Sequence, residues 1–179
     1  TIIPVGQAAI PDVQLGAGGY DHYPVSPYGA GNDQPFYLLR EIAPPMEDRG
    51  AWSISGASST TCPTSAATRD IGTITGAPNG RPDILEAVEG LPCHGGSDGQ
   101  ESTGPALYAT ATGMGLTWPG GMMPARSCPA IPDEPAARRG YPCFRPSSLP
   151  IVIVFGDYDW HNGPPDTSSP YSFPAPGYM

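Results

Sequence analysis

The stretch "LPIVIVFGDYDWHNGP" at residues 149–164 decides which fold the sequence predicts. Its apolar part, residues 151–155, is continuous rather than alternating, which is typical of a strand buried on both faces of a parallel sheet. Asp157 and Asp159 would then follow the carboxyl end of that strand, at the edge where open α/β sheets bind ligands. An ordinary polar loop after a core strand explains the same pattern, so both interpretations stay open on this segment alone.

Working outward from this stretch, four further segments suit an α/β order. Segments 10–24 and 34–42 resemble strands in their apolar patterns, and segment 81–91 predicts a helix with a proline in its first turn and one apolar stripe. Segment 101–113 predicts a second helix that a glycine ends. The order strand, strand, helix, helix, strand indicates an α/β layered domain.

The charge of the chain restricts its partners. The 179 residues include 8 basic and 17 acidic side chains, a formal net charge of −9, and every basic residue is an arginine. Because binding to a phosphate backbone needs clustered positive charge, no nucleic-acid partner is expected. A hard cation is a more natural companion for this charge, although solubility alone explains it. No stretch approaches the roughly 18 apolar residues of a membrane span, so none is expected.

Glycine and proline are unusually frequent, with 24 and 25 residues respectively. Such a composition is also found in disordered chains, but the strand and helix patterns indicate a folded core that carries long irregular loops. We expect one domain over residues 1–179, with long loop insertions at 44–80 and 114–148 and coil at 164–179.

The four cysteines lie in these Pro/Gly-rich stretches, and none of them has the two-residue spacing of a zinc knuckle. Disulfides in an oxidising, extracellular or cell-surface compartment are therefore predicted. The pair Cys128 and Cys143, which would close a short loop, is the first choice, and Cys62 and Cys93 then form the second pair. Three connectivities are possible, and four free thiols in a cytosolic protein remain an alternative.

A group of carboxylates is the strongest candidate for a binding site. Asp98 and Glu101 lie on a glycine loop in "GGSDGQESTGPAL" (95–107), directly before the second helix. Helix capping explains the neighbouring Ser102 but not why two carboxylates are presented together. A parallel sheet could bring Asp157 to the same edge, and such clusters of oxygen ligands suit Mg²⁺ or Ca²⁺.

The segments "GGSDGQESTGPALYATATG" (95–113) and "GDYDWHNGP" (156–164) together resemble von Willebrand factor type A domains. The resemblance is greatest to the inserted domain of integrin β subunits and its secreted bacterial relatives. It implies a doubly wound, mostly parallel α/β sheet with a metal-ion-dependent adhesion site at its carboxyl edge. In that site Glu101 takes the ligand position of the second loop, Asp157 that of the third loop, and Asp98 binds an adjacent calcium.

The chain also departs from the pattern of this family. The signature first loop, Asp-x-Ser-x-Ser, does not occur in these 179 residues, and Gly156 stands where a Thr usually precedes the third-loop Asp. The resemblance therefore implies an incomplete domain, without its first strand and last two strands, in which a metal would be short of its principal ligands. We expect another chain or segment to complete the open sheet edges.

Two functions follow from these observations. The resemblance implies an extracellular binding module, not an enzyme, that recognises a protein or cell-surface ligand through a bound divalent cation. The alternative is a structural or assembly protein of the cell surface or of a filament, which keeps the fold without metal-dependent binding. A hydrolase is disfavoured because the stretches "GASSTTC" and "HGGSDG", the second of which matches Gly-x-Ser-x-Gly at residues 95–99, resemble a nucleophile elbow only loosely. A histidine in a turn, such as His161, is also more often a surface residue than a general base.

Overall fold

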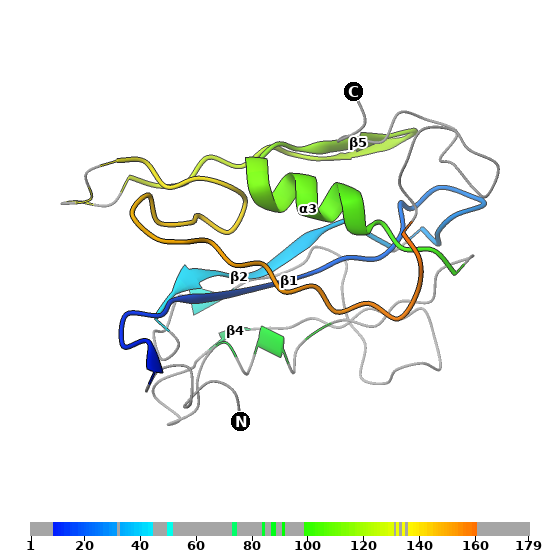
Figure 1. Ribbon diagram of the computed structural model, residues 1–179. Coiled ribbons are helices and arrows are strands. Elements are labelled where there is room, and N and C mark those ends of the chain that lie inside the picture. The colour runs from blue at the N-terminus through cyan, green and yellow to red at the C-terminus, as the bar shows by residue number, and fades with distance from the viewer. Residues whose placement is uncertain are drawn as a thin grey trace.

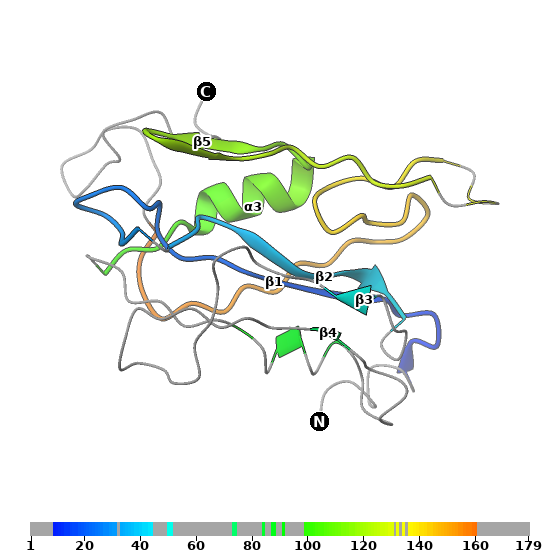
Figure 2. The ribbon, with the colours of Figure 1, turned by 180° about the vertical axis from the view of Figure 1, so that it is seen from behind.

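The computed structural model describes residues 9–31, 33–44, 50–51, 73–74, 84, 87–88, 91, 99–130, 132, 134 and 136–160. In this part of the chain, three antiparallel two-stranded sheets accompany helix α3. Figures 1 and 2 show α3 between the hairpin that contains β5 and the β1–β2 pair, and the short strands β3 and β4 lie beyond that pair.

The β1–β2 pair forms the middle of the fold. Strand β1 (Leu15–Gly19) runs antiparallel to β2 (Tyr37–Ala43), with Leu15 opposite Ala43 and Gly19 opposite Tyr37. The first four residues of β2 are buried; Tyr37, Leu38 and Leu39 are apolar, as a buried strand requires, and the fourth is Arg40. Glycines suit β1 because the ring of Tyr37 lies where a side chain on Gly19 would be. The strand predicted at 34–42 is therefore present, shifted slightly along the chain.

Two smaller sheets contain the remaining described strands. Strand β3 (Gly50–Ala51) pairs with β4 (Thr73–Ile74), and β5 (Leu116–Trp118) pairs with β6 (Gly121–Met123). The β5–β6 turn has glycine at its second central position, Gly120, with φ 87°, the left-handed conformation that a type II turn needs there. The expected loop insertion 114–148 therefore begins with a hairpin.

Helix α3 (Thr103–Thr112) confirms the helix predicted at 101–113. It ends at Gly113, which has φ 75° and donates its backbone N–H to the carbonyl oxygen of Ala109, as a left-handed C-terminal glycine does. The buried residues of α3 are small, with Ala106 and Ala109 among them. Small side chains allow the helix to lie close to its aromatic neighbours on both sides.

The main core is aromatic. Its buried residues come from the segment between β1 and β2, from α3 and from the hairpin: Tyr23, Tyr28, Phe36, Ala106, Ala109, Leu116 and Met123. Tyr23 meets Trp118 edge to face, with ring centroids 5.6 Å apart. A second cluster joins Tyr37 and Leu39 of β2 to Ala87, which is helical together with Ile84 and Val88, within the helix predicted at 81–91.

The predicted doubly wound, mostly parallel sheet is wrong. Every described strand pairs antiparallel, and residues 151–155 form no strand. Ile151, Ile153 and Phe155 are 70%, 72% and 82% exposed, so they are not a central strand. The physical reason is that the aromatic residues and α3 already fill the core, and a continuous apolar run does not by itself distinguish a buried strand from an exposed segment.

The predicted disulfide between Cys128 and Cys143 is present, with the two Cα atoms 5.5 Å apart. Cys62 and Cys93 lie outside the described residues. In the described part of the chain, no helix has the length and apolar character that crossing a membrane requires.

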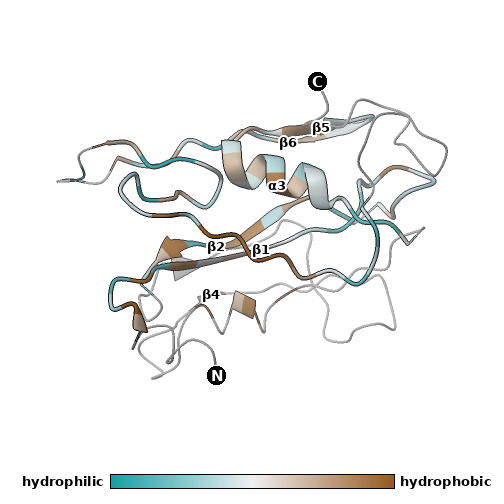
Figure 3. Cartoon of the chain, viewed as in Figure 1, coloured by the Kyte–Doolittle hydropathy of each residue, from teal (hydrophilic) through white to brown (hydrophobic). Residues whose placement is uncertain are grey.

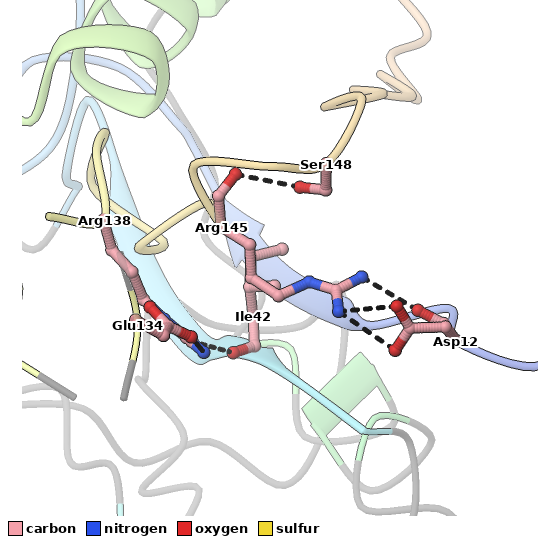
Figure 4. Close-up of polar contacts among 6 residues, drawn as sticks. All are labelled: Asp12, Ile42, Glu134, Arg138, Arg145 and Ser148. Atoms are coloured by element: carbon pink, nitrogen blue, oxygen red, sulfur yellow. Dashed lines mark hydrogen bonds and ion pairs between the residues drawn. The ribbon is translucent and has the colours of Figure 1, made fainter. Parts of the chain in front are cut away.

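Two ion pairs fix the segment that follows the hairpin (Figure 4). Arg138 donates to both carboxylate oxygens of Glu134 and, at 3.3 Å, to the backbone carbonyl of Ile42 at the end of β2. Arg145 donates to the carboxylate of Asp12 at 2.9 and 3.0 Å and to its backbone carbonyl at 2.9 Å. These bonds hold the chain against the β1–β2 pair just before the apolar run begins.

Candidate functional site

The start of α3 joins two segments that are distant in the sequence. The backbone N–H of Glu101 donates to the carbonyl oxygen of Asp159 at 3.0 Å, and the N–H of Ser102 donates to that of Asp21 at 3.1 Å. A parallel bridge connects Glu101 with Trp160. These N–H groups at the start of α3 therefore hold two other segments of the same chain.

Titratable side chains gather around this junction. His22 is 2% exposed, and its Nδ1 lies 3.6 Å from Oε2 of Glu101. Asp33 is also buried and accepts a hydrogen bond from the backbone N–H of Ala30 at 2.6 Å. Burial raises the pKa of Tyr37 strongly, and the charges of Asp21, Glu101 and Asp33 raise it further. These groups form one electrostatic cluster beside β2.

The pKa of Glu101 is raised. Burial is the largest cause; the charge of His22 opposes it, and the negative charges of Asp21, Asp157 and Asp33 add to it. The charge of Asp157 thus acts electrostatically on Glu101, the other described carboxylate that the sequence assigned to a metal. The segments of the two residues are joined at the start of α3 by the backbone bond from Glu101 to Asp159.

The predicted metal site is only partly within the described residues. Asp98 lies outside them, and Asp157 is exposed. Among the described side chains, no group of three or more His, Cys, Asp or Glu is arranged to hold a metal ion. The described residues alone therefore do not fit Mg²⁺ or Ca²⁺, and metal binding by Glu101, Asp157 and Asp98 stays a prediction.

Sequence reasoning missed His22 and Asp33 as members of this cluster. Both lie in the segment between β1 and β2, have no regular secondary structure, and are buried. A histidine close to two tyrosines in "YDHYP" (20–24) was the available signal. The neighbouring Ser102 is fully buried, so its hydroxyl group is not accessible as a nucleophile to a substrate in solution.

We expect Glu101→Gln to stabilise the protein at neutral pH. A carboxyl group whose folded-state pKa is raised binds its proton more tightly in the folded than in the unfolded chain. Its contribution to stability therefore falls as the pH rises from the unfolded-state pKa through the folded-state pKa, and it is recovered on acidification. Because glutamine stays neutral, the Glu101→Gln variant does not lose this stability as the pH rises. Urea unfolding over a range of pH would measure both effects.

Glu134→Gln is the matched control, because a hydrogen bond from Arg138 lowers the pKa of Glu134. Its stabilising contribution is present above the unfolded-state pKa and is lost as the pH falls through the folded-state pKa. The two variants should therefore change the pH dependence in opposite directions. Equal pH profiles for Glu101→Gln and the wild type would contradict a destabilising charge at the junction.

The second candidate site is the apolar segment, which we define as residues 149–155. Tyr20 donates its hydroxyl group to the backbone carbonyl of Phe155 at 3.0 Å, and the bonds of Arg145 and of Glu101 hold the chain before and after it. Figures 1 and 2 agree that the chain passes across one side of β1 here, and Figure 3 shows this stretch as one of the most hydrophobic of the described chain.

Between these anchors, the apolar side chains at both odd-numbered and even-numbered positions are exposed. Leu149, Ile151, Ile153 and Phe155 are at least 70% exposed, and Val152 and Val154 are 49% and 38% exposed. Among the described residues, no backbone–backbone hydrogen bond involves residues 149–158. The apolar segment therefore presents its side chains to solvent.

No family model, no curated protein and no solved structure matches this chain. The resemblance to von Willebrand factor type A domains thus rests on the sequence motifs alone. What the chain does has to be argued from the two sites themselves.

An exposed contiguous apolar surface is unusual on a soluble monomer and is characteristic of interaction sites. Single exposed apolar residues are common and need no explanation, but here the exposed residues are consecutive. The anchors on both sides hold the segment in place against the body of the protein. This arrangement leaves the apolar side chains available for contact with another protein.

Proposed function

We propose that this chain is a binding and assembly protein, not an enzyme, and that the apolar segment is its contact surface for another protein. The observation that carries the proposal is the exposure of six apolar side chains in residues 149–155. Covering them on association would remove apolar area from water, which is the main favourable term in most protein–protein contacts. The proposal corresponds to the assembly alternative of the sequence analysis.

We place this function outside the cell or at its surface, and the disulfide supports that part of the proposal. The disulfide Cys128–Cys143 is of the kind that persists in oxidising compartments. It closes the loop directly before the apolar segment, and Cys143 is itself buried. A covalent link at this place keeps the route of the chain toward the segment fixed when a partner binds.

Metal-dependent adhesion is not needed for this function. The described carboxylates do not reach the number that a cation site requires, so we derive no step through a metal. The backbone at the start of α3 instead holds the chain just after the apolar segment, because the N–H of Glu101 bonds to the carbonyl oxygen of Asp159.

A photo-cross-linking amino acid tests the proposed surface. Benzoylphenylalanine at position 155 replaces an aromatic residue that is 82% exposed, so the fold should tolerate it. In the native source, we expect irradiation to give a defined cross-linked species, with both linked peptides mapped by mass spectrometry. The same amino acid at Met122, which is 64% exposed on β6, is the control. Equal or absent cross-linking at the two positions would overturn the proposed function.

A further inference from the structure

We propose that the apolar segment and the residues that follow it bind an arginine-bearing segment of a different protein, whose guanidinium groups stack on Tyr158 and Trp160. This inference rests on the proposed function and names the chemistry of the partner. It follows from three features: the exposed rings of residues 155–160, which we call the aromatic end, the carboxylates between these rings, and the state of the cations that this chain itself carries.

The aromatic end exposes three large rings close together in the sequence. Phe155, Tyr158 and Trp160 are 82%, 58% and 55% exposed. The face of an aromatic ring attracts cations, and arginine is the commonest partner because its planar guanidinium group also stacks on the ring. The aromatic end therefore offers a guanidinium group surfaces on which to stack, next to the apolar side chains of residues 149–154.

The aromatic end is held in place by the rest of the chain. The bonds described above anchor its backbone at the carbonyl groups of Phe155 and Asp159. Tyr158 also lies against the backbone of Gly99, where an added Cβ atom would come within 2.9 Å of the ring. A surface that is already fixed loses less conformational freedom when a partner binds, so less of the binding energy is spent on ordering it.

Two carboxylates alternate with the rings and determine the charge of the partner. Asp157 and Asp159 are exposed, and neither side chain has a hydrogen bond or ion pair with the described part of the chain. Burial and three other carboxylates raise the pKa of Glu101, and only the charge of His22 opposes them, so negative charge prevails here. A partner that covers the rings must bring positive charge, because it would otherwise remove carboxylates from water without compensation.

The described cations of this chain are largely bound within it. Apart from the exposed Arg139, the described arginines either pair with carboxylates of the same chain, as Arg126, Arg138 and Arg145 do, or are buried, as Arg40 is. One exposed arginine does not offset a formal net charge of −9 on each of two copies. The positive charge therefore comes from a different protein.

Synthetic peptides test the chemistry of the partner. The probe is a short, fluorescently labelled peptide of alternating arginine and leucine, and fluorescence anisotropy follows its binding to the full chain. We expect saturable binding that weakens as salt is added. The matching lysine peptide should bind several-fold more weakly, since an ammonium group does not stack as a planar guanidinium does, and the glutamate peptide should not bind. Equal binding of the arginine and lysine peptides, or no saturable binding of either, would overturn the inference.

Substitutions place the binding on the aromatic end. Asp157→Asn, Asp159→Asn and Tyr158→Ala are each expected to weaken binding of the arginine peptide about threefold. Glu134→Gln is the matched control, because it also removes one negative charge but lies away from the aromatic end, in an ion pair with Arg138. Circular dichroism checks that every variant is folded. If Glu134→Gln weakened binding as much as the aspartate variants, the peptide would follow only the net charge, and the inference would be wrong.

The cross-link from position 155 separates this inference from the proposed function. A mapped partner peptide with arginine close to the linked residue would support both. A defined protein partner without arginine there, or a second copy of this chain, would overturn the arginine inference and leave the proposed function supported. A link to a glycan, or no specific cross-link, would overturn the proposed function and this inference with it.

Discussion

Arg40→Ala is expected to lower the free energy of unfolding by about 2–5 kcal/mol, the range observed when a large buried side chain is truncated to alanine. Arg40 is fully buried in β2, and among the described residues it is the largest of the completely buried side chains. Its guanidinium group donates to the backbone carbonyls of Leu15, Glu41, Ala43 and Pro44. Alanine would leave these acceptors without their donor and would open a cavity beside the β1–β2 pair.

Urea unfolding followed by circular dichroism would measure this loss. Arg40→Lys keeps the charge but has no planar fork of donors, so we expect it to recover only part of the stability. Arg139→Ala is the control, because Arg139 is exposed and surface substitutions usually change stability by less than about 0.5 kcal/mol. If Arg40→Ala and Arg139→Ala unfolded at the same urea concentration, the buried arginine would not support the sheet.

Removal of the disulfide is the second large effect that we expect. Cys128 and Cys143 are 15 residues apart, and for a loop of this length the chain-entropy model gives about 3 kcal/mol of stabilisation. The double substitution Cys128→Ala and Cys143→Ala should lower the unfolding free energy by about this amount. Alanine is preferred to serine because Cys143 is 1% exposed, and a buried hydroxyl group would add a separate cost.

Thermal unfolding of the double variant, compared with the wild type with and without reductant, would measure the effect. Reductant should lower the midpoint of the wild type toward that of the variant. Reductant should also shift the unfolding midpoint of the wild type more than that of the variant, because the variant no longer has this bond. An unchanged midpoint in the double variant would show that the ion pairs of Arg138 and Arg145 hold this part of the chain without the disulfide.

Strong local patterns made part of this fold predictable. The alanine-rich helix with its terminal glycine became α3, and the apolar run at 34–42 became β2. The pair Cys128 and Cys143 was also correct, since a short loop between two cysteines needs little information from the rest of the chain. Each of these features depends on residues that are close together in the sequence.

The errors arose where distant residues decide the outcome. Residues 151–155 have the composition of a core strand, but whether such a run is buried depends on which other residues fill the core. Here Tyr23 and α3 occupy it. The same reasoning applies to the candidate site. The burial of His22 and Asp33 follows from packing that no local pattern encodes, and metal binding by Glu101 and Asp157 stays a prediction.

The hydrogen bond from Tyr20 to Phe155 spans 135 residues of sequence, and the bonds between Arg145 and Asp12 span 133. Contacts of such high sequence separation form slowly, because closing a long loop costs entropy before the contact is gained. During translation, Asp12 and Tyr20 leave the ribosome long before their partners have been made. We therefore expect the apolar run to be the last described part of a newly made chain to be secured. Until then it is a natural binding site for a chaperone.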